Sequence, residues 1–98
     1  MIQVVAFHET AVVELNEAAD FYNLECPGLG LTFLQEVQTA LATIAQFPEA
    51  TPLLHGPVRR KVLLGFPYTG IYSLRDEQIR VLALAHEKRR HFFWRGRR

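Results

Sequence analysis

Histidines and basic residues are the side chains in this sequence with the clearest chemical potential. Cleaving RNA through its 2′-hydroxyl needs a base, an acid and cations beside the phosphate, and histidine can supply the first two because it titrates near neutral pH. The chain has four histidines: His8, His55, His86 and His91. Only His86 has a strong positional argument, since it ends an apolar run and a basic cluster follows it: Lys88, Arg89 and Arg90. His86 is the candidate catalytic residue, and a structural role at the end of a strand is the alternative.

Spacing argues against a compact acid–base site around His86. In a β-strand, residues of the same parity share a face, so we expect Arg80 and His86 on one side of the last strand. At about 3.3 Å per residue these two side chains lie roughly 20 Å apart, which is too far for both to contact one phosphate. The pattern therefore favours an extended track of positive charge over a two-residue ribonuclease site.

Charge is distributed very unevenly along the chain. Residues 1–58 contain seven acids and no Lys or Arg, a net charge of −7, whereas residues 59–98 contain eleven bases against three acids, a net charge of +8. This asymmetry indicates an acidic protein or a polyanion as partner of the second half; a fold whose faces merely differ in charge is the alternative. The candidate target-binding residues are Arg59, Arg60, Lys61, Arg80, Lys88, Arg89 and Arg90.

Other classes of site find little support in the sequence. Metal binding is not expected, because one cysteine and four scattered histidines show no C-x₂-C or H-x₃-H spacing. The glycines of "PGLG", residues 27–30, lack the surrounding pattern of a phosphate loop and are interpreted as turn residues. We therefore expect neither a metal nor a cofactor.

Composition predicts one soluble domain over residues 1–98. Cys26 is the only cysteine and cannot form an intrachain disulfide, and the N-terminal residues lack the features of a signal peptide. No uncharged apolar run approaches the roughly 20 residues that a membrane span needs. These observations predict a cytoplasmic protein with no membrane association.

Hydrophobic periodicity predicts an α+β fold in the order β-α-α-β-β-β. A β-branched run at residues 2–7 is typical of a strand, and apolar residues recur at helical spacing after Thr10, a plausible N-cap. A second helical stripe follows "PGLG" and ends at Pro48. Short separators then indicate antiparallel strands at residues 58–64, 68–74 and 79–86. The helices should form a hairpin over one face of a small, mainly antiparallel sheet of four strands, with residues 48–57 as a loop.

The aromatic and basic tail after His86 permits two interpretations. Phe92, Phe93 and Trp94 stand among arginines, an arrangement that could stack bases while cations hold phosphates. Left in solvent, however, three consecutive aromatic residues would expose a large apolar patch. We therefore favour burial of at least Trp94 against the sheet, with the tail arginines on the surface.

Three separated blocks of the sequence resemble a known family. They are "PGLGLTFLQEV", "RR-VLLGFPY--IYSL" and "IRVLALAH-KRR---W", in that order between about residues 11 and 95. Together they resemble the ParE/RelE superfamily of bacterial type II toxin–antitoxin toxins, and more closely its ParE-like branch. The resemblance implies a small cytosolic toxin of a plasmid-stabilisation system, which an acidic antitoxin neutralises by wrapping it. A homodimer or a hetero-oligomer with the antitoxin is compatible with this expectation.

The family resemblance implies two mechanisms that differ in their target. ParE-like members inhibit DNA gyrase without being nucleases, whereas RelE-like members cut messenger RNA in the ribosome with basic residues and a C-terminal tyrosine or histidine. This chain has the ParE-like residue at Arg59, Arg60, Phe66, Pro67, Tyr68, Tyr72, His86, Arg89 and Trp94, and departs from it at Gly70, Lys88, His91 and Phe93. Phe93 stands where a tyrosine is usual, which disfavours a tyrosine-dependent ribonuclease. Gyrase inhibition is the favoured expectation, messenger RNA cleavage is the alternative, and an inactive or regulatory binding domain is held in reserve. Tyr68, Tyr72 and Trp94 are interpreted as structural.

Overall fold

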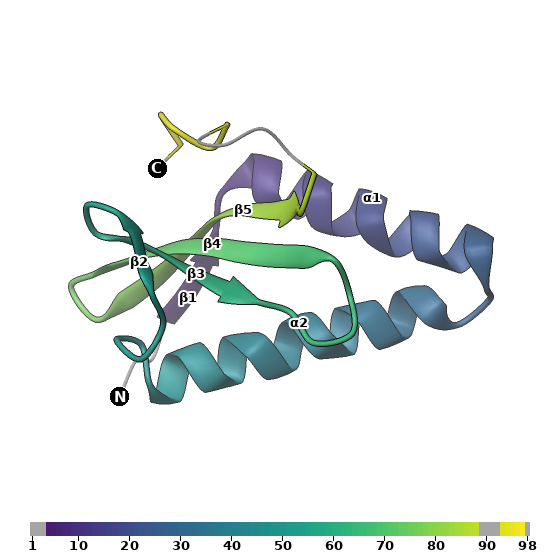
Figure 1. Cartoon of the computed structure of the whole chain (residues 1–98), viewed down its shortest axis with the longest axis horizontal. Coiled ribbons are helices and arrows are strands. Elements are labelled where there is room, and N and C mark those ends of the chain that lie inside the picture. The colour runs from purple at the N-terminus through teal and green to yellow at the C-terminus, as the bar shows by residue number, and fades with distance from the viewer. Residues whose placement is uncertain (1–3, 89–92, 98) are drawn as a thin grey trace.

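The computed structural model describes residues 4–88 and 93–97 and has two helices followed by most of a mixed sheet (Figure 1). The elements are β1 (Val4–Phe7), α1 (Glu9–Glu25), α2 (Leu29–Gln46), β2 (Leu53–His55), β3 (Val58–Val62), β4 (Tyr68–Arg75) and β5 (Gln78–His86). The strand order is β1-β5-β4-β3-β2, with β1 parallel to β5 and every other neighbouring pair antiparallel. The predicted α+β fold, with a helical hairpin on a mainly antiparallel sheet, is confirmed.

Within the described residues, the sheet contains one strand that the sequence does not predict. β2 lies inside the segment expected to be a loop, and it pairs with β3 through Leu53 opposite Arg59 and His55 opposite Val58. Only three residues long, it is too short for periodicity to mark it. Its partner is reached across a tight turn in which Gly56 has a positive φ of 56°. Within residues 4–88 and 93–97 the sheet therefore has five strands in place of the expected four.

Each helix begins slightly before its predicted start. The N-cap of α1 is His8, whose Nδ1 accepts a hydrogen bond of 3.1 Å from the backbone N–H of Thr10. Gly28 precedes α2 in the left-handed conformation, with a φ of 91°. Gly30 is consequently a helical residue, and its interpretation as a turn residue is wrong. It is buried where α2 approaches α1, and its N–H donates to Asn23 Oδ1 at 2.8 Å.

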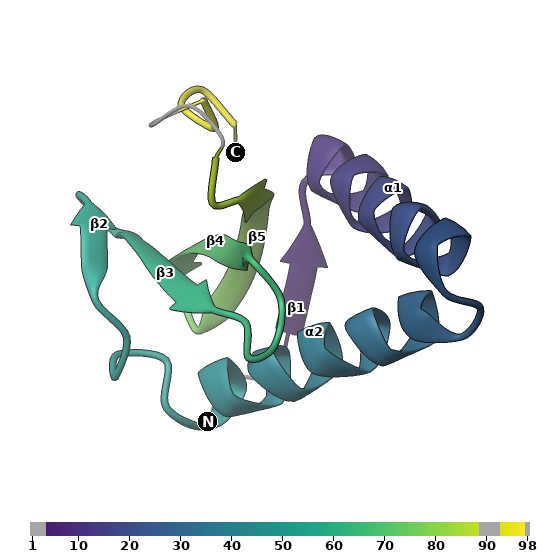
Figure 2. The same cartoon turned by 45° about the vertical axis from the view of Figure 1, so that its right-hand side comes forward.

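Two apolar clusters fill the space between the helices and the sheet. One is centred on Phe33, and its buried members are Ala18, Ala19, Phe33, Val37, Ala40, Leu63 and Leu84. The other is centred on Tyr72, and its buried members are Ala11, Ile44, Tyr72, Ile79 and Val81. A third cluster lies on the opposite face of the sheet and contains Val58, Ile71, Leu82, Ala83, Ala85 and Trp94. The hairpin thus covers one face and the C-terminal segment 93–97 the other (Figure 2).

Strand β5 contains a β-bulge in its pairing with β4. Ile71 pairs with Ala83 and the next residue, Tyr72, pairs with Val81, so Leu82 is an extra residue on β5. An extra residue shifts the alternation of side chains by one position. Val81 accordingly packs on the helix side, whereas Leu82 and Ala83 both pack on the opposite side.

The bulge separates Arg80 from His86. Arg80 precedes it and lines the same cavity as Leu82, on the face opposite the helices. His86 follows it and contacts Tyr68, which packs on the helix-side core. The prediction that Arg80 and His86 share a face is therefore wrong, because simple alternation does not anticipate an inserted residue. Leu84, which simple alternation places on the same face as Arg80, also packs on the helix side.

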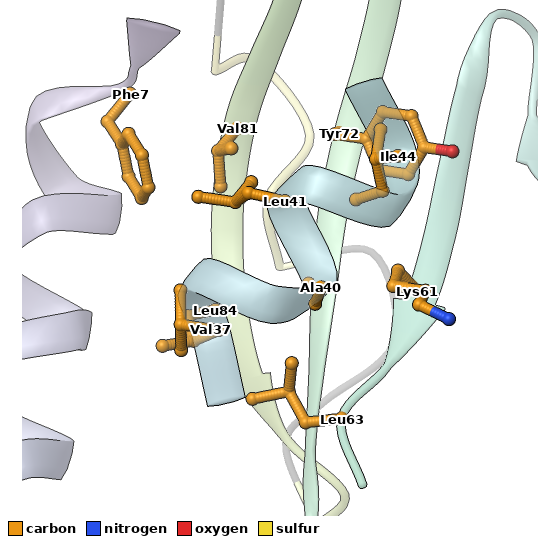
Figure 3. Close-up of a pocket in the computed structure, with 11 residues that line it drawn as sticks. Phe7, Val37, Ala40, Leu41, Ile44, Lys61, Leu63, Tyr72, Val81 and Leu84 are labelled. Atoms are coloured by element: carbon orange, nitrogen blue, oxygen red, sulfur yellow. The ribbon is translucent and has the colours of Figure 1, made fainter. Parts of the chain in front are cut away.

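A narrow apolar cleft of about 20 Å³ remains between α2 and the sheet. Figure 3 shows Leu41 and Ile44 of α2 next to Val81 and Tyr72 of the sheet, with which they pack. Lys61 extends its ammonium away from these apolar side chains. Gly70 of β4 also lines this cleft. The lining is apolar apart from Lys61 and Tyr72, whose hydroxyl already bonds Pro48 and Thr51, so a trapped water would lack the polar partners that it needs.

Two glycines allow one chemical change to be tested in opposite environments. A Cβ on Gly70 would meet only the Lys61 carbonyl oxygen at 3.7 Å, whereas a Cβ on Gly30 would overlap the Ala19 carbonyl and the Asn23 side chain. We expect Gly70→Ala to raise the free energy of unfolding by about 0.5–1 kcal/mol, since glycine weakens a strand interior. Gly30→Ala should lower it by about 1–3 kcal/mol through overpacking. Urea denaturation of both variants checks this pair, and effects of the same sign would contradict it.

No helix in the described part of the chain has both the length and the apolar character that crossing a bilayer requires.

Candidate functional site

The basic residues predicted to bind a target divide between the two faces of the sheet. Lys61 lies on the helix side, where it lines the cleft beneath α2. Because side chains alternate along a strand, Arg60 points to the opposite face, the face on which Arg80 also lies. Lys88 follows β5 and is exposed. Arg89 and Arg90 lie outside the described residues. The described cations therefore do not form the single track that the sequence suggested.

Arg59 is engaged in holding the segment between α2 and β2. Its Nη1 donates to the backbone carbonyl of Thr51 at 2.6 Å and to that of Glu49 at 3.1 Å. The hydroxyl of Tyr72 donates to the Pro48 carbonyl at 3.0 Å and also bonds the Thr51 hydroxyl. Tyr72 is only 1% exposed. Together these side chains fix the path of the chain from the end of α2 into the sheet.

His86 occupies an acidic and aromatic environment. It lies in a groove between α1 and the sheet that also contains Glu14, Glu17 and Phe21. The ring of Tyr68 meets the imidazole edge-on, with centroids 5.1 Å apart. His86 Nδ1 accepts a hydrogen bond of 3.1 Å from the Lys88 backbone N–H.

The electrostatics of this groove are unsuited to phosphate. Burial, and then the carboxylates of Glu14 and Glu17, raise the pKa of Tyr68 above its ordinary value of 10.0, so its hydroxyl stays protonated at neutral pH. No Lys or Arg among the described residues lines the groove. His86 thus shares its groove with carboxylates, whereas phosphate cleavage would require cations to line the groove with it.

The C-terminal segment is anchored by Trp94. This ring is 5% exposed and packs in the cluster on the face opposite the helices. The partly buried Phe93 packs against the same cluster, and the guanidinium of Arg97 lies 5.1 Å from the centre of its ring. Gly96 turns the chain with a φ of 90°.

An ion pair closes the exposed edge of β5. β1 pairs only with Gln78–Val81, so the remainder of that edge has no strand beside it among the described residues. Arg97 Nη1 bonds Glu14 Oε1 at 2.8 Å and the Leu82 carbonyl at 3.0 Å, and Glu14 Oε1 also accepts the Leu84 N–H at 3.1 Å. The pair therefore satisfies strand groups that would otherwise be open to another chain.

Sequence reasoning missed this pair and also a cavity on the opposite face. Glu14 and Arg97 are 83 positions apart, and no local pattern links them. The cavity, of about 510 Å³, is lined in part by Ser73, Arg75, Gln78, Arg80, Leu82 and Arg97. The register of the β4–β5 hairpin could have predicted that its strand residues lie together. Across the two-residue turn at 76–77, Arg75 is opposite Gln78 and Ser73 is opposite Arg80.

Metal binding has no structural support within residues 4–88 and 93–97. No group of three His, Cys, Asp or Glu side chains in these ranges could hold an ion.

Comparison with known proteins identifies the family. The model of the family described as "ParE toxin of type II toxin-antitoxin system, parDE" matches residues 5–91. The chain belongs to the ParE toxin family. No curated protein matches the sequence. The resemblance to the ParE-like branch, drawn from the three sequence blocks, is thereby confirmed.

A solved structure has the same fold as this ParE-family chain. It is described as "Chromosomal ParDE TA system from P. aeruginosa", where TA stands for toxin–antitoxin. The two structures superpose with a TM-score of 0.75 at 17% sequence identity, over 87% of this chain and 96% of the other. At that identity the likeness supports the fold alone, namely the helical hairpin on a mainly antiparallel sheet.

Proposed function

We propose that this ParE-family toxin inhibits DNA gyrase without acting as a nuclease. The observation that carries the proposal is the separation of His86 from Arg80 by the bulge in β5. His86 lies in a groove with two carboxylates, and none of the described cations lines it. The described residues therefore offer no site where an acid–base pair and phosphate-binding cations meet. Phe93 lacks the hydroxyl that a tyrosine would supply for proton transfer.

A cognate acidic antitoxin is the second part of the proposal. The net charge of +8 on residues 59–98 favours a partner of opposite charge. Large apolar side chains are also exposed around β2 and β3, namely Leu53, Val62 and Leu64, and exposed apolar surface of this kind often marks a protein interface. The solved structure with the same fold is that of a chromosomal ParDE system. We infer that an antitoxin segment covers this edge of the sheet and offsets the positive charge.

Gyrase assays test the proposed target. The purified protein should block supercoiling or trap cleaved plasmid, and translation extracts treated with it should keep their messenger RNA intact. Expression alone should harm cells, and co-expression of a short acidic protein from the neighbouring reading frame should relieve the harm. Codon-dependent cuts in ribosome-bound message would instead establish the endonuclease alternative.

His86→Asn separates binding from proton transfer. The asparagine Oδ1 can accept the Lys88 N–H in place of His86 Nδ1, so the end of β5 should remain ordered. A non-enzymatic toxin should keep its gyrase inhibition in this variant. An endonuclease that uses His86 as an acid or a base would lose about 10²–10⁴-fold in rate, and a loss of that size would overturn the proposal.

A further inference from the structure

The cavity on the face opposite the helices has an unusual set of charges. Its floor is formed by neighbouring positions of β4 and β5, and Arg97 of the C-terminal segment contributes to its wall. Three arginines line it, and no Asp or Glu does so among the described residues. Arg97 already pairs with Glu14. The side chains of Arg75 and Arg80 have neither a hydrogen bond nor an ion pair with any described residue.

Arg80 gives the strongest indication of a ligand among these side chains. Its Nε is buried and has no hydrogen-bond partner within the described structure. Buried polar groups are nearly always hydrogen-bonded in native proteins, and a buried donor attached to a cation is especially costly to leave unpaired. Arg59 offers a contrast within the same molecule, since its guanidinium donates hydrogen bonds to two backbone carbonyls. The Nε of Arg80, which has no partner among the described residues, is therefore available to an acceptor that enters the cavity.

Further donors stand beside Arg80 in the sheet. Ser73 is directly opposite Arg80, and Gln78 is directly opposite Arg75. Residues directly opposite have Cβ atoms about 5 Å apart, and diagonal pairs such as Arg75 and Arg80 about 7–8 Å apart. Two long guanidinium side chains can thus reach one ligand from adjacent strands, with a hydroxyl and an amide between them.

We propose that this cavity binds a phosphate group. Arg75 and Arg80 would match its charge, while the Ser73 hydroxyl and the Gln78 amide would donate to its remaining oxygens. A carboxylate has two coplanar oxygens, which one guanidinium can satisfy alone, whereas phosphate presents oxygens in several directions to donors from two strands. No aromatic ring among the described residues lines the cavity. The site would therefore bind a phosphate group without stacking a nucleic-acid base. This inference is independent of gyrase inhibition and of the antitoxin.

The phosphate could come from a small molecule or from the backbone of a nucleic acid. Titrations of the whole purified protein with inorganic phosphate and with a short DNA duplex distinguish these sources. Saturation with inorganic phosphate alone assigns the site to free phosphate compounds. Competition between phosphate and the duplex assigns it to a backbone phosphodiester. Either result supports the proposal, whereas an acidic poly-glutamate peptide that binds through Arg80 where phosphate does not would overturn it in favour of a protein partner.

Matched variants locate the binding. Arg80→Gln should weaken phosphate binding at least about tenfold, because a charge-assisted hydrogen bond is lost. The exposed Arg75→Gln should weaken it too and is not expected to disturb folding. Arg60→Gln removes a charge from the same face outside the cavity and should leave the affinity for inorganic phosphate unchanged. The Nε resonance of Arg80 in a nitrogen–proton correlation spectrum should shift on adding phosphate. An Arg80 Nε resonance that does not shift would refute the site. So would three variants that all bind phosphate with the same affinity as one another.

Discussion

Trp94→Ala is expected to lower the free energy of unfolding by about 3–5 kcal/mol, the cost of truncating a large buried aromatic side chain. The indole is 5% exposed and packs with residues of three strands in the cluster opposite the helices. Its loss would leave a cavity beside Leu82 and Ala83 and release the segment that covers them. Chemical denaturation followed by circular dichroism measures the change.

A control distinguishes burial from general sensitivity to mutation. Leu24 on α1 is 88% exposed, and Leu24→Ala should change the free energy of unfolding by no more than about 0.5 kcal/mol. Gyrase inhibition by Trp94→Ala should fall in proportion to the folded fraction. A Trp94→Ala protein that unfolds at the denaturant concentration of the parent would show that the tail contributes nothing to stability.

Breaking the Glu14–Arg97 pair should have an effect of similar size. Both side chains are 13% exposed, and each also bonds the backbone of β5. Removing either side chain takes away the opposite charge that the other one bonds in a mostly buried position, and breaking a buried ion pair in this way typically costs about 3–5 kcal/mol. We expect Glu14→Ala and Arg97→Ala each to lower the free energy of unfolding by about 3 kcal/mol.

The double variant separates the pair from its surroundings. Because both single changes break the same ion pair, the double variant should cost less than the sum of the two. Glu14→Gln keeps an oxygen that can accept the Leu84 N–H while removing the charge, so it should be less destabilising than Glu14→Ala. Strict additivity in denaturant titrations would show that the two side chains act independently.

Local sequence patterns predicted the parts of the fold that depend on local interactions. The helical stripes around Leu15 and Val37 mark α1 and α2, and short separators mark the antiparallel strands. Their boundaries shifted by one or two residues, because the caps are His8 and Gly28 and are set by individual hydrogen bonds and dihedral angles. Membership of the ParE toxin family was also recognisable from the three sequence blocks.

The features that define the candidate sites depend on contacts between distant residues. The bulge at Leu82 arises from the pairing of β4 with β5, and the alternation rule cannot detect it. It moved His86 away from Arg80 and so removed the expected charged track. The ion pair of Glu14 with Arg97, and the cavity around Arg80, likewise appear only once the strands are assembled. The functional roles assigned to the basic residues from sequence remain predictions.

The position of β5 in the sheet has a consequence for biosynthesis. The first strand along the chain, β1, has β5 as its neighbour, and β5 is the last of the described strands to be made. Ribosomes add about 5–20 residues per second, so β1 waits for several seconds, without its partner, while the following residues are translated. Contacts between such distant segments also form slowly, because a long loop must close before they stabilise the chain. The complete sheet can therefore form only after residues up to His86 have emerged, and the surfaces that include β5 are absent from shorter nascent chains.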